Sequence, residues 1–116
     1  MSKIIVYEKP TCTTCRKVAN ALIENGVDFE KVNYYIKPFS RTKLQSLLKK
    51  MNMKPSELLR KNEKVYKDLK FKEKNYTENQ ILDLMIEHPD LVQRPIVEKG
   101  EHTILARPVE KIKELF

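Results

Sequence analysis

One junction near the N-terminus constrains the fold of this chain more than any other stretch. The apolar run from Ile4 to Tyr7 is too short for a buried helix and is typical of a strand, and Pro10 then prevents further pairing because it lacks a backbone donor. From Thr13 onward apolar residues recur at helical spacing, and Gly26 is the residue type expected just past a helix end. The sequence therefore predicts a strand, a tight turn and a helix before Gly26.

Two cysteines, Cys12 and Cys15, lie at the start of this predicted helix. Because a helix N-terminus carries unpaired N–H groups and the positive end of the helix dipole, it stabilises a thiolate. We therefore expect Cys12 to be the more acidic thiol and Cys15, one turn inside, to be the more covered and able to close a disulfide with Cys12. Glu8 would raise the pKa of Cys12, whereas Lys9 and Arg16 would lower it. The alternative interpretation makes both cysteines small core residues without chemistry.

The length of 116 residues allows one domain with a single core, and we expect that domain to span 1–116. No apolar run approaches the ~20 residues of a membrane span, and the apolar start ends too soon for a signal peptide, so we expect a cytoplasmic protein without a membrane partner. Two cysteines only three positions apart indicate redox or nucleophilic use in a reducing compartment. Zinc would need four ligands, and only His88 and His102 could add to the two sulfurs, so we expect no metal.

The formal net charge of +7 attracts anions of any kind. The lysines are spread over every predicted helix, and we find no aromatic residues interleaved with a basic cluster. We therefore interpret the charge as a solvated surface, and we expect a monomer that does not bind nucleic acid directly.

The middle of the chain is predicted to be helical. Helical segments are expected over about 40–52, 55–60 and 77–88, and only a short helical turn is expected within 63–75. The first begins with Ser40 as a natural N-cap, and the last begins with a capping box formed by Thr77 and Gln80. Apolar stripes at helical spacing support both of these longer segments.

Strand signals flank this helical region. Phe29 to Tyr34 predicts a second strand parallel to the first, which closes a βαβ unit. Residues 96–105 predict an antiparallel hairpin that turns at Lys99-Gly100.

A last helix is expected to start at Pro108, with Val109, Ile112 and Leu115 on one face. The element order is therefore βαβ, helices and ββα. It predicts an α/β protein with a thioredoxin-like fold, in which a mixed four-stranded sheet carries an inserted helical subdomain at about 40–90.

Five short motifs now point to a known family. In chain order they are Pro-Thr-Cys-Thr-Thr-Cys-Arg-Lys at Cys12, Leu-Leu-Arg-Lys-Asn at Arg60, His88-Pro89, Arg94-Pro95-Ile96-Val97 and Ala106-Arg107-Pro108. Over essentially its whole length the chain resembles the glutaredoxin-linked arsenate reductase family and its Spx-type relatives. The resemblance implies that Cys12 attacks arsenate and that Arg60, Arg94 and Arg107 bind the oxyanion. It also implies a cis peptide bond between Arg94 and Pro95 beside the nucleophile.

The implied function is a thiol-dependent reduction of arsenate without a bound cofactor. Arginine forks match tetrahedral oxyanions bidentately, so several convergent arginines suit such a substrate. Glutathione with glutaredoxin, a thioredoxin-type donor, or Cys15 would resolve the covalent intermediate.

Two other functions stay open. The first is an Spx-like redox regulator that binds RNA polymerase through a Cys12–Cys15 disulfide switch, since the Cys-x-x-Cys form is more typical of those relatives. The second is a general thiol-disulfide oxidoreductase. The segment Arg107-Pro108-Val109-Glu110 resembles the ending of the reductases more than that of the regulators.

Overall fold

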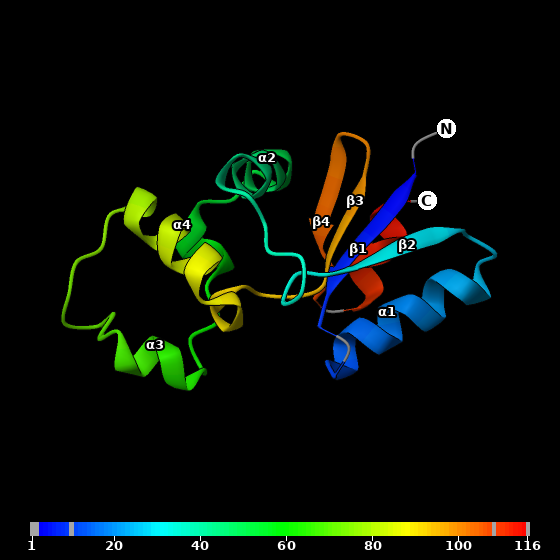
Figure 1. Cartoon of the computed structure of the whole chain (residues 1–116). Helices are drawn as coiled ribbons and strands as arrows, with labels where there is room; N and C mark the ends of the chain where they lie inside the picture. The colour runs from blue at the N-terminus through cyan, green and yellow to red at the C-terminus, as the bar shows by residue number, and fades with distance from the viewer. Residues whose placement is uncertain (1–2, 10, 108, 116) are drawn as a thin grey trace. The chain divides into compact units, whose positions relative to one another are not determined.

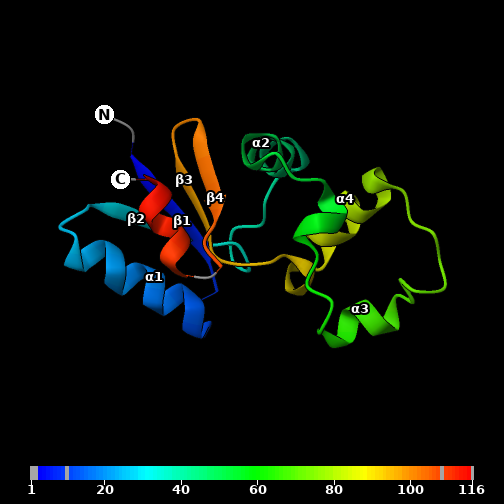
Figure 2. The ribbon, with the colours of Figure 1, turned by 180° about the vertical axis from the view of Figure 1, so that it is seen from behind.

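The computed structural model describes residues 3–9, 11–107 and 109–115 and forms two compact units (Figures 1 and 2). Unit 1 comprises Met1–Lys37 and Arg94–Phe116, and unit 2 comprises Pro38–Gln93. The bounds of unit 2 lie close to the helical insertion expected at about 40–90, and the interpretation as one domain with an insertion stays a prediction. Within the described ranges, every helix is too short or too polar to cross a membrane.

Unit 1 is built on a mixed sheet. Its elements are β1 (Ile4–Glu8), α1 (Thr13–Glu24), β2 (Phe29–Asn33), β3 (Ile96–Lys99), β4 (His102–Leu105) and the 3₁₀ helix η3 (Val109–Leu115). The strand order is β2-β1-β3-β4; β1 pairs parallel with β2 and antiparallel with β3, which pairs antiparallel with β4. The βαβ and ββα units expected from the sequence therefore share one sheet, which confirms the thioredoxin-like fold. Tyr34, expected in the second strand, lies just beyond its end.

The core of unit 1 lies between one face of the sheet and the two helices α1 and η3. Alternate residues of a strand point to opposite faces, so Ile4 and Val6 of β1 both reach this side. The other buried members are Val18, Leu22, Val97, Ile104, Ala106, Ile112 and Leu115.

The last helix differs from the expectation in type. It is a 3₁₀ helix over Val109–Leu115, and its expected first residue, Pro108, lies outside the described residues, as does Pro10. A 3₁₀ helix has three residues per turn, so the spacing of Val109, Ile112 and Leu115 by three places all of them on one face. This spacing fits the 3₁₀ form better than an α-helix.

The opposite face of the sheet carries a buried polar pair. The hydroxyl of Tyr7 donates to a carboxylate oxygen of Glu98 at 2.7 Å, and both side chains are buried. Burial, together with this hydrogen bond and the Glu98 charge, raises the pKa of Tyr7 well above its usual value near 10.

Unit 2 is helical. It contains α2 (Arg41–Met51), η1 (Pro55–Leu58), α3 (Lys64–Asp68), α4 (Glu78–Glu87) and η2 (Pro89–Leu91). The predicted caps are confirmed: the Ser40 hydroxyl accepts from the Lys43 amide at 3.0 Å, and Thr77 and Gln80 form a reciprocal capping box.

The predicted helix over 55–60 ends early, as a 3₁₀ helix at Leu58. Leu59 has an extended backbone and bridges Val92, and the amide of Arg60 donates to the carbonyl of Leu91 at 2.7 Å. These backbone groups therefore pair with the segment after α4 and do not continue the helix.

Candidate functional site

Cys12 is the N-cap of α1, at the junction that the sequence predicts. Its backbone is extended, and its amide closes the turn by donating to the carbonyl of Lys9 at 2.9 Å. Its Sγ accepts from the backbone amide of Cys15 at 3.3 Å. Cys12 is partly exposed, whereas the side chain of Cys15 is 0 % exposed. Of the two free thiols, Cys12 is therefore the accessible one.

The surroundings separate the pKa values of the two thiols. Burial alone would raise the pKa of Cys12, but hydrogen bonds from Cys15 and the charge and hydrogen bond of Arg94 lower it below its usual value. Burial, followed by the hydrogen bond with Cys12, raises the pKa of Cys15 to about 12. The expectation that Cys12 is the more acidic thiol agrees with these directions.

Arg94 is the residue that brings positive charge to Cys12. It precedes Pro95, the Arg94–Pro95 peptide bond is cis as expected, and its side chain is only 6 % exposed. One guanidinium nitrogen donates to the Tyr35 hydroxyl at 3.5 Å. Its Nε is buried and has no hydrogen-bond partner among the described residues. Because a buried donor without a partner is costly, this N–H is suited to an incoming acceptor.

Arg107 is tied to the same turn. Its guanidinium donates to the backbone carbonyl of Arg94 at 2.8 Å. It also lines a cavity of about 530 Å³ together with Thr14 and Lys17 of α1 and with Val109 and Glu110. Since Thr14 follows Cys12 by two residues, unit 1 gathers Cys12, Arg94 and Arg107 around the start of α1.

Arg60 belongs to unit 2. Its guanidinium forms an ion pair with Glu63 at 3.1 Å, and both side chains are partly buried. The expectation that Arg60 joins Cys12 stays a prediction.

Two tyrosines near the site were missed in the sequence. Tyr34 and Tyr35 follow the end of β2 and, with Cys12, raise the pKa of Arg94 against the opposing effect of its burial. Lys9 lies over the Tyr35 ring at 4.9 Å from its centre. The carboxyl ends of parallel neighbours such as β1 and β2 meet at one edge of the sheet, and this rule could have placed Tyr35 near Cys12.

Glu8 acts on the buried thiol. Burial raises the pKa of Glu8 against the opposing charge of Lys31, 4.0 Å away, and the Glu8 charge helps to raise the pKa of Cys15.

Within the described residues, no group of three or more His, Cys, Asp or Glu side chains is placed to hold a metal ion.

Comparison with known proteins identifies the family. The sequence pattern of the ArsC family matches residues 7–115. This chain belongs to the ArsC family. The match confirms the family resemblance drawn from the five motifs.

Individual relatives of this ArsC protein agree with that assignment. An arsenate reductase of Acidiphilium multivorum is 35% identical over 116 residues, which cover 100% of this chain and 82% of the relative. The global transcriptional regulator Spx 1 of Lactococcus lactis is 32% identical over 99 residues, covering 85% of this chain and 77% of the regulator. Among solved structures, a putative arsenate reductase from Yersinia pestis superposes with a TM-score of 0.90 at 29% identity, covering 97% of this chain and 99% of that one.

Proposed function

We propose that this ArsC protein is a thiol-dependent arsenate reductase with Cys12 as its nucleophile. The observation that carries the proposal is the juxtaposition of the accessible Cys12 sulfur with the buried guanidinium of Arg94, whose Nε–H has no partner among the described residues. One side chain thus supports both the thiolate and a bound oxyanion. The relatives that bear the name arsenate reductase and span the full chain support the same activity.

The chemistry balances with two thiols. The Cys12 thiolate attacks arsenic and forms an S–As bond, while one arsenate oxygen takes up protons and leaves as water. A second thiol then attacks the Cys12 sulfur, so that an S–S bond forms and the S–As electron pair passes to arsenic, which leaves as arsenite. Overall, one arsenate and two thiols give one arsenite, one disulfide and one water.

The arginines stabilise the negative charge of the oxyanion during the first step. Arg94 supplies its free Nε–H and its charge, and Arg107, held on the Arg94 carbonyl, supplies a second guanidinium. In this proposal Arg60 is the third arginine that binds the oxyanion.

The second thiol is either external or Cys15. Glutathione, with glutaredoxin or a thioredoxin-type donor reducing the product, would reach Cys12 from solvent because Cys12 is partly exposed. Cys15 is one turn away, but its burial and its pKa of about 12 keep it protonated near neutral pH. These properties favour an external thiol for the resolving step. In this proposal the protein acts as a monomer in the cytoplasm and needs no bound cofactor.

The test is arsenate-dependent oxidation of NADPH in the presence of glutathione, glutathione reductase and glutaredoxin. We expect activity in the wild-type protein, none above background in Cys12→Ser, and retained activity in Cys15→Ser. Loss of activity in Cys15→Ser, with the protein folded, would assign the resolving step to Cys15. A wild-type protein that neither reduces arsenate nor binds arsenate, phosphate or sulfate would contradict the proposal.

A redox-sensing regulator is the second candidate function, and the similarity to Spx 1 favours it. In this function the Cys12–Cys15 disulfide would change binding to RNA polymerase, with no substrate turned over. Such a switch has no need of a free, buried arginine donor beside Cys12. Oxidation-dependent binding to RNA polymerase, without arsenate reduction, would favour the regulator.

A further inference from the structure

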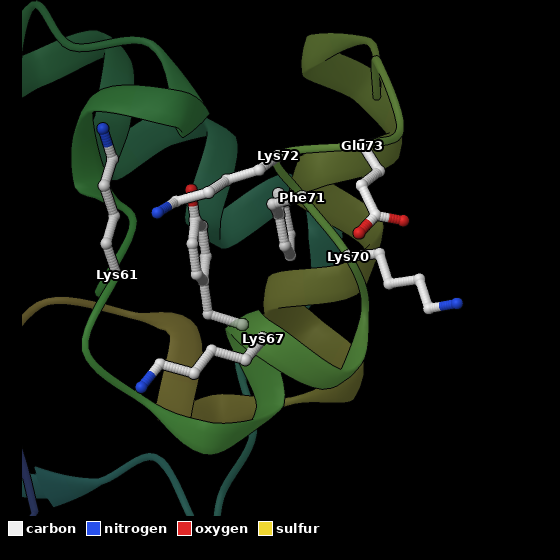
Figure 3. Close-up of a pocket in the computed structure, with 7 residues that line it drawn as sticks. Lys61, Lys67, Lys70, Phe71, Lys72 and Glu73 are labelled. Carbon is white, nitrogen blue, oxygen red and sulfur yellow. The ribbon is translucent and has the colours of Figure 1, made fainter.

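A cavity of about 250 Å³ lies within unit 2. It is lined by Lys61, Tyr66, Lys67, Lys70, Phe71, Lys72 and Glu73 (Figure 3). Between positions 61 and 74 the chain has six lysines and three acidic residues, and Tyr66 and Phe71 lie among them. The expectation that no aromatic residues interleave with a basic cluster was therefore wrong for this segment.

The aromatic rings of the segment form a stack. Tyr66 and Phe71 are nearly parallel, with an interplanar angle of 7° and ring centres 4.7 Å apart. Tyr76 packs against Phe71 at 4.9 Å, and its hydroxyl donates to the carbonyl of Leu69 at 2.8 Å. Lys70 has a left-handed backbone (φ +56°), which reverses the chain after α3 and returns Phe71 to Tyr66. The stack is therefore fixed by the turn and by the Tyr76 hydrogen bond.

Positive charge gathers on one side of this stack. The ammonium groups of Lys61, Lys67 and Lys72 extend to the same side of the Phe71 ring, whereas the amine of Lys70 and the carboxylate of Glu73 lie on the other side (Figure 3). All the lysines that line the cavity are exposed, and the two stacked rings are half-buried. The cavity thus has an aromatic wall and three lysine ammonium groups on one side of the Phe71 ring.

We propose that this cavity binds a nucleotide, with its base stacked on the aromatic wall and its phosphates on Lys61, Lys67 and Lys72. Every base has a flat π-face that an aromatic side chain can stack on, and lysine binds phosphate as a compact point charge. The volume lies just below the ~300–1,000 Å³ of pockets that bury drug-sized ligands, which suits a single nucleotide. An acidic peptide would form ion pairs with the lysines but would not stack on the aromatic rings.

The same chemistry is offered by a free nucleoside diphosphate and by a nucleotide within single-stranded nucleic acid. Calorimetric titration of the full chain with ADP, with pyrophosphate, with a short single-stranded oligonucleotide and with poly-glutamate separates the ligands. We expect ADP to bind about five- to a hundredfold more tightly than pyrophosphate, since stacking contributes to ADP alone. A tighter oligonucleotide identifies single strands as the ligand, and a tighter ADP identifies the free nucleotide.

Variants locate the binding. Lys67→Gln combined with Lys72→Gln should weaken ADP binding at least tenfold and flatten its dependence on salt. The matched control, Lys111→Gln with Lys113→Gln, removes two exposed lysines of η3 and should leave ADP binding within about twofold.

The aromatic wall has its own variants. Tyr66→Leu should abolish the preference for ADP over pyrophosphate, and Tyr66→Phe, which keeps the stack, should bind ADP as the wild-type protein does. Circular dichroism checks that each variant is folded. The proposal is overturned if ADP does not bind at millimolar concentration, if pyrophosphate or poly-glutamate binds as tightly as ADP, or if the control pair weakens binding equally.

Discussion

Replacing Arg94 tests the proposed site most directly, because this one side chain acts on Cys12 in two ways. Its charge and hydrogen bond lower the pKa of Cys12, and its Nε–H is free for an oxyanion. Arg94→Met removes both effects, because the Met side chain carries neither a charge nor an N–H donor and places a methyl group at the position of Nε. The backbone carbonyl that accepts from Arg107 also remains.

The size of the effect follows from the lost donor. A hydrogen bond to a charged group contributes about 1.5–3 kcal/mol, so kcat/KM for arsenate should fall roughly ten- to a hundredfold. The higher pKa of Cys12 in the variant adds a further loss at neutral pH, because less of the thiol is ionised. This second loss disappears once the pH exceeds the pKa of Cys12 in the variant. The ratio of wild-type to variant activity should therefore shrink as the pH rises.

Two measurements separate these contributions. Arsenate-dependent NADPH oxidation from about pH 6 to about pH 9 follows turnover, and iodoacetamide alkylation over the same range follows the Cys12 thiolate. Arg94→Lys should keep most of the thiolate reactivity but recover turnover only in part, since lysine lacks the planar fork. Arg16→Met removes an exposed arginine from the first turns of α1 that is not among the groups lowering the pKa of Cys12, and it serves as the matched control, with turnover within about threefold of wild type. An unchanged alkylation profile and near-wild-type turnover in a folded Arg94→Met protein would refute the reasoning.

Three further predictions concern the thiols and the sheet. Iodoacetamide at neutral pH should label Cys12 first and Cys15 only after unfolding, as peptide mass spectrometry will report; the reverse order would be inconsistent with the pKa of about 12 for Cys15. Mild oxidation should remove two hydrogens from the peptide that holds both cysteines, whereas exclusively intermolecular disulfides would argue against a Cys12–Cys15 pair. Tyr7→Phe should cost about 1–3 kcal/mol in urea unfolding, because the buried Glu98 carboxylate loses a donor. The pKa of Tyr7 in the folded protein lies above its unfolded value of about 10. The stability that the Tyr7 proton contributes is therefore present below about pH 10 and declines as the pH rises further. A Tyr7→Phe protein with the same alkaline decline in stability would count against this assignment.

Local signals in the sequence were sufficient for most element boundaries. Ser40 and Thr77 begin helices because their hydroxyls satisfy backbone amides within three residues, and no distant contact is needed for that. Gly26 and Gly100 have positive φ values of 66° and 58°, so each ends an element through its own backbone. The position of Cys12 at the start of α1 followed from the same kind of evidence.

The site could be predicted only in part, because its contacts are distant in sequence. Arg94 donates to Tyr35 across 59 positions, and no periodicity or composition reveals such a pair. The cis bond at Pro95 was expected only from the family resemblance, since cis is the minority state of X-Pro bonds. The stack of Tyr66 on Phe71 was also missed, because its spacing of five residues fits neither helix nor strand and depends on the left-handed turn at Lys70.

The register of the sheet determines the order in which the two units can be completed during synthesis. β1 lies in the middle of the sheet, and Ile4 pairs with Lys99 on one side and with Phe29 on the other. A nascent chain that has emerged only to residue 93 already holds every residue of unit 2, a single continuous segment. The same nascent chain leaves one edge of β1 unpaired, and closing that edge requires contacts across 89 to 95 positions. On the ribosome, unit 2 can therefore fold before β3 and β4 have emerged to complete the sheet.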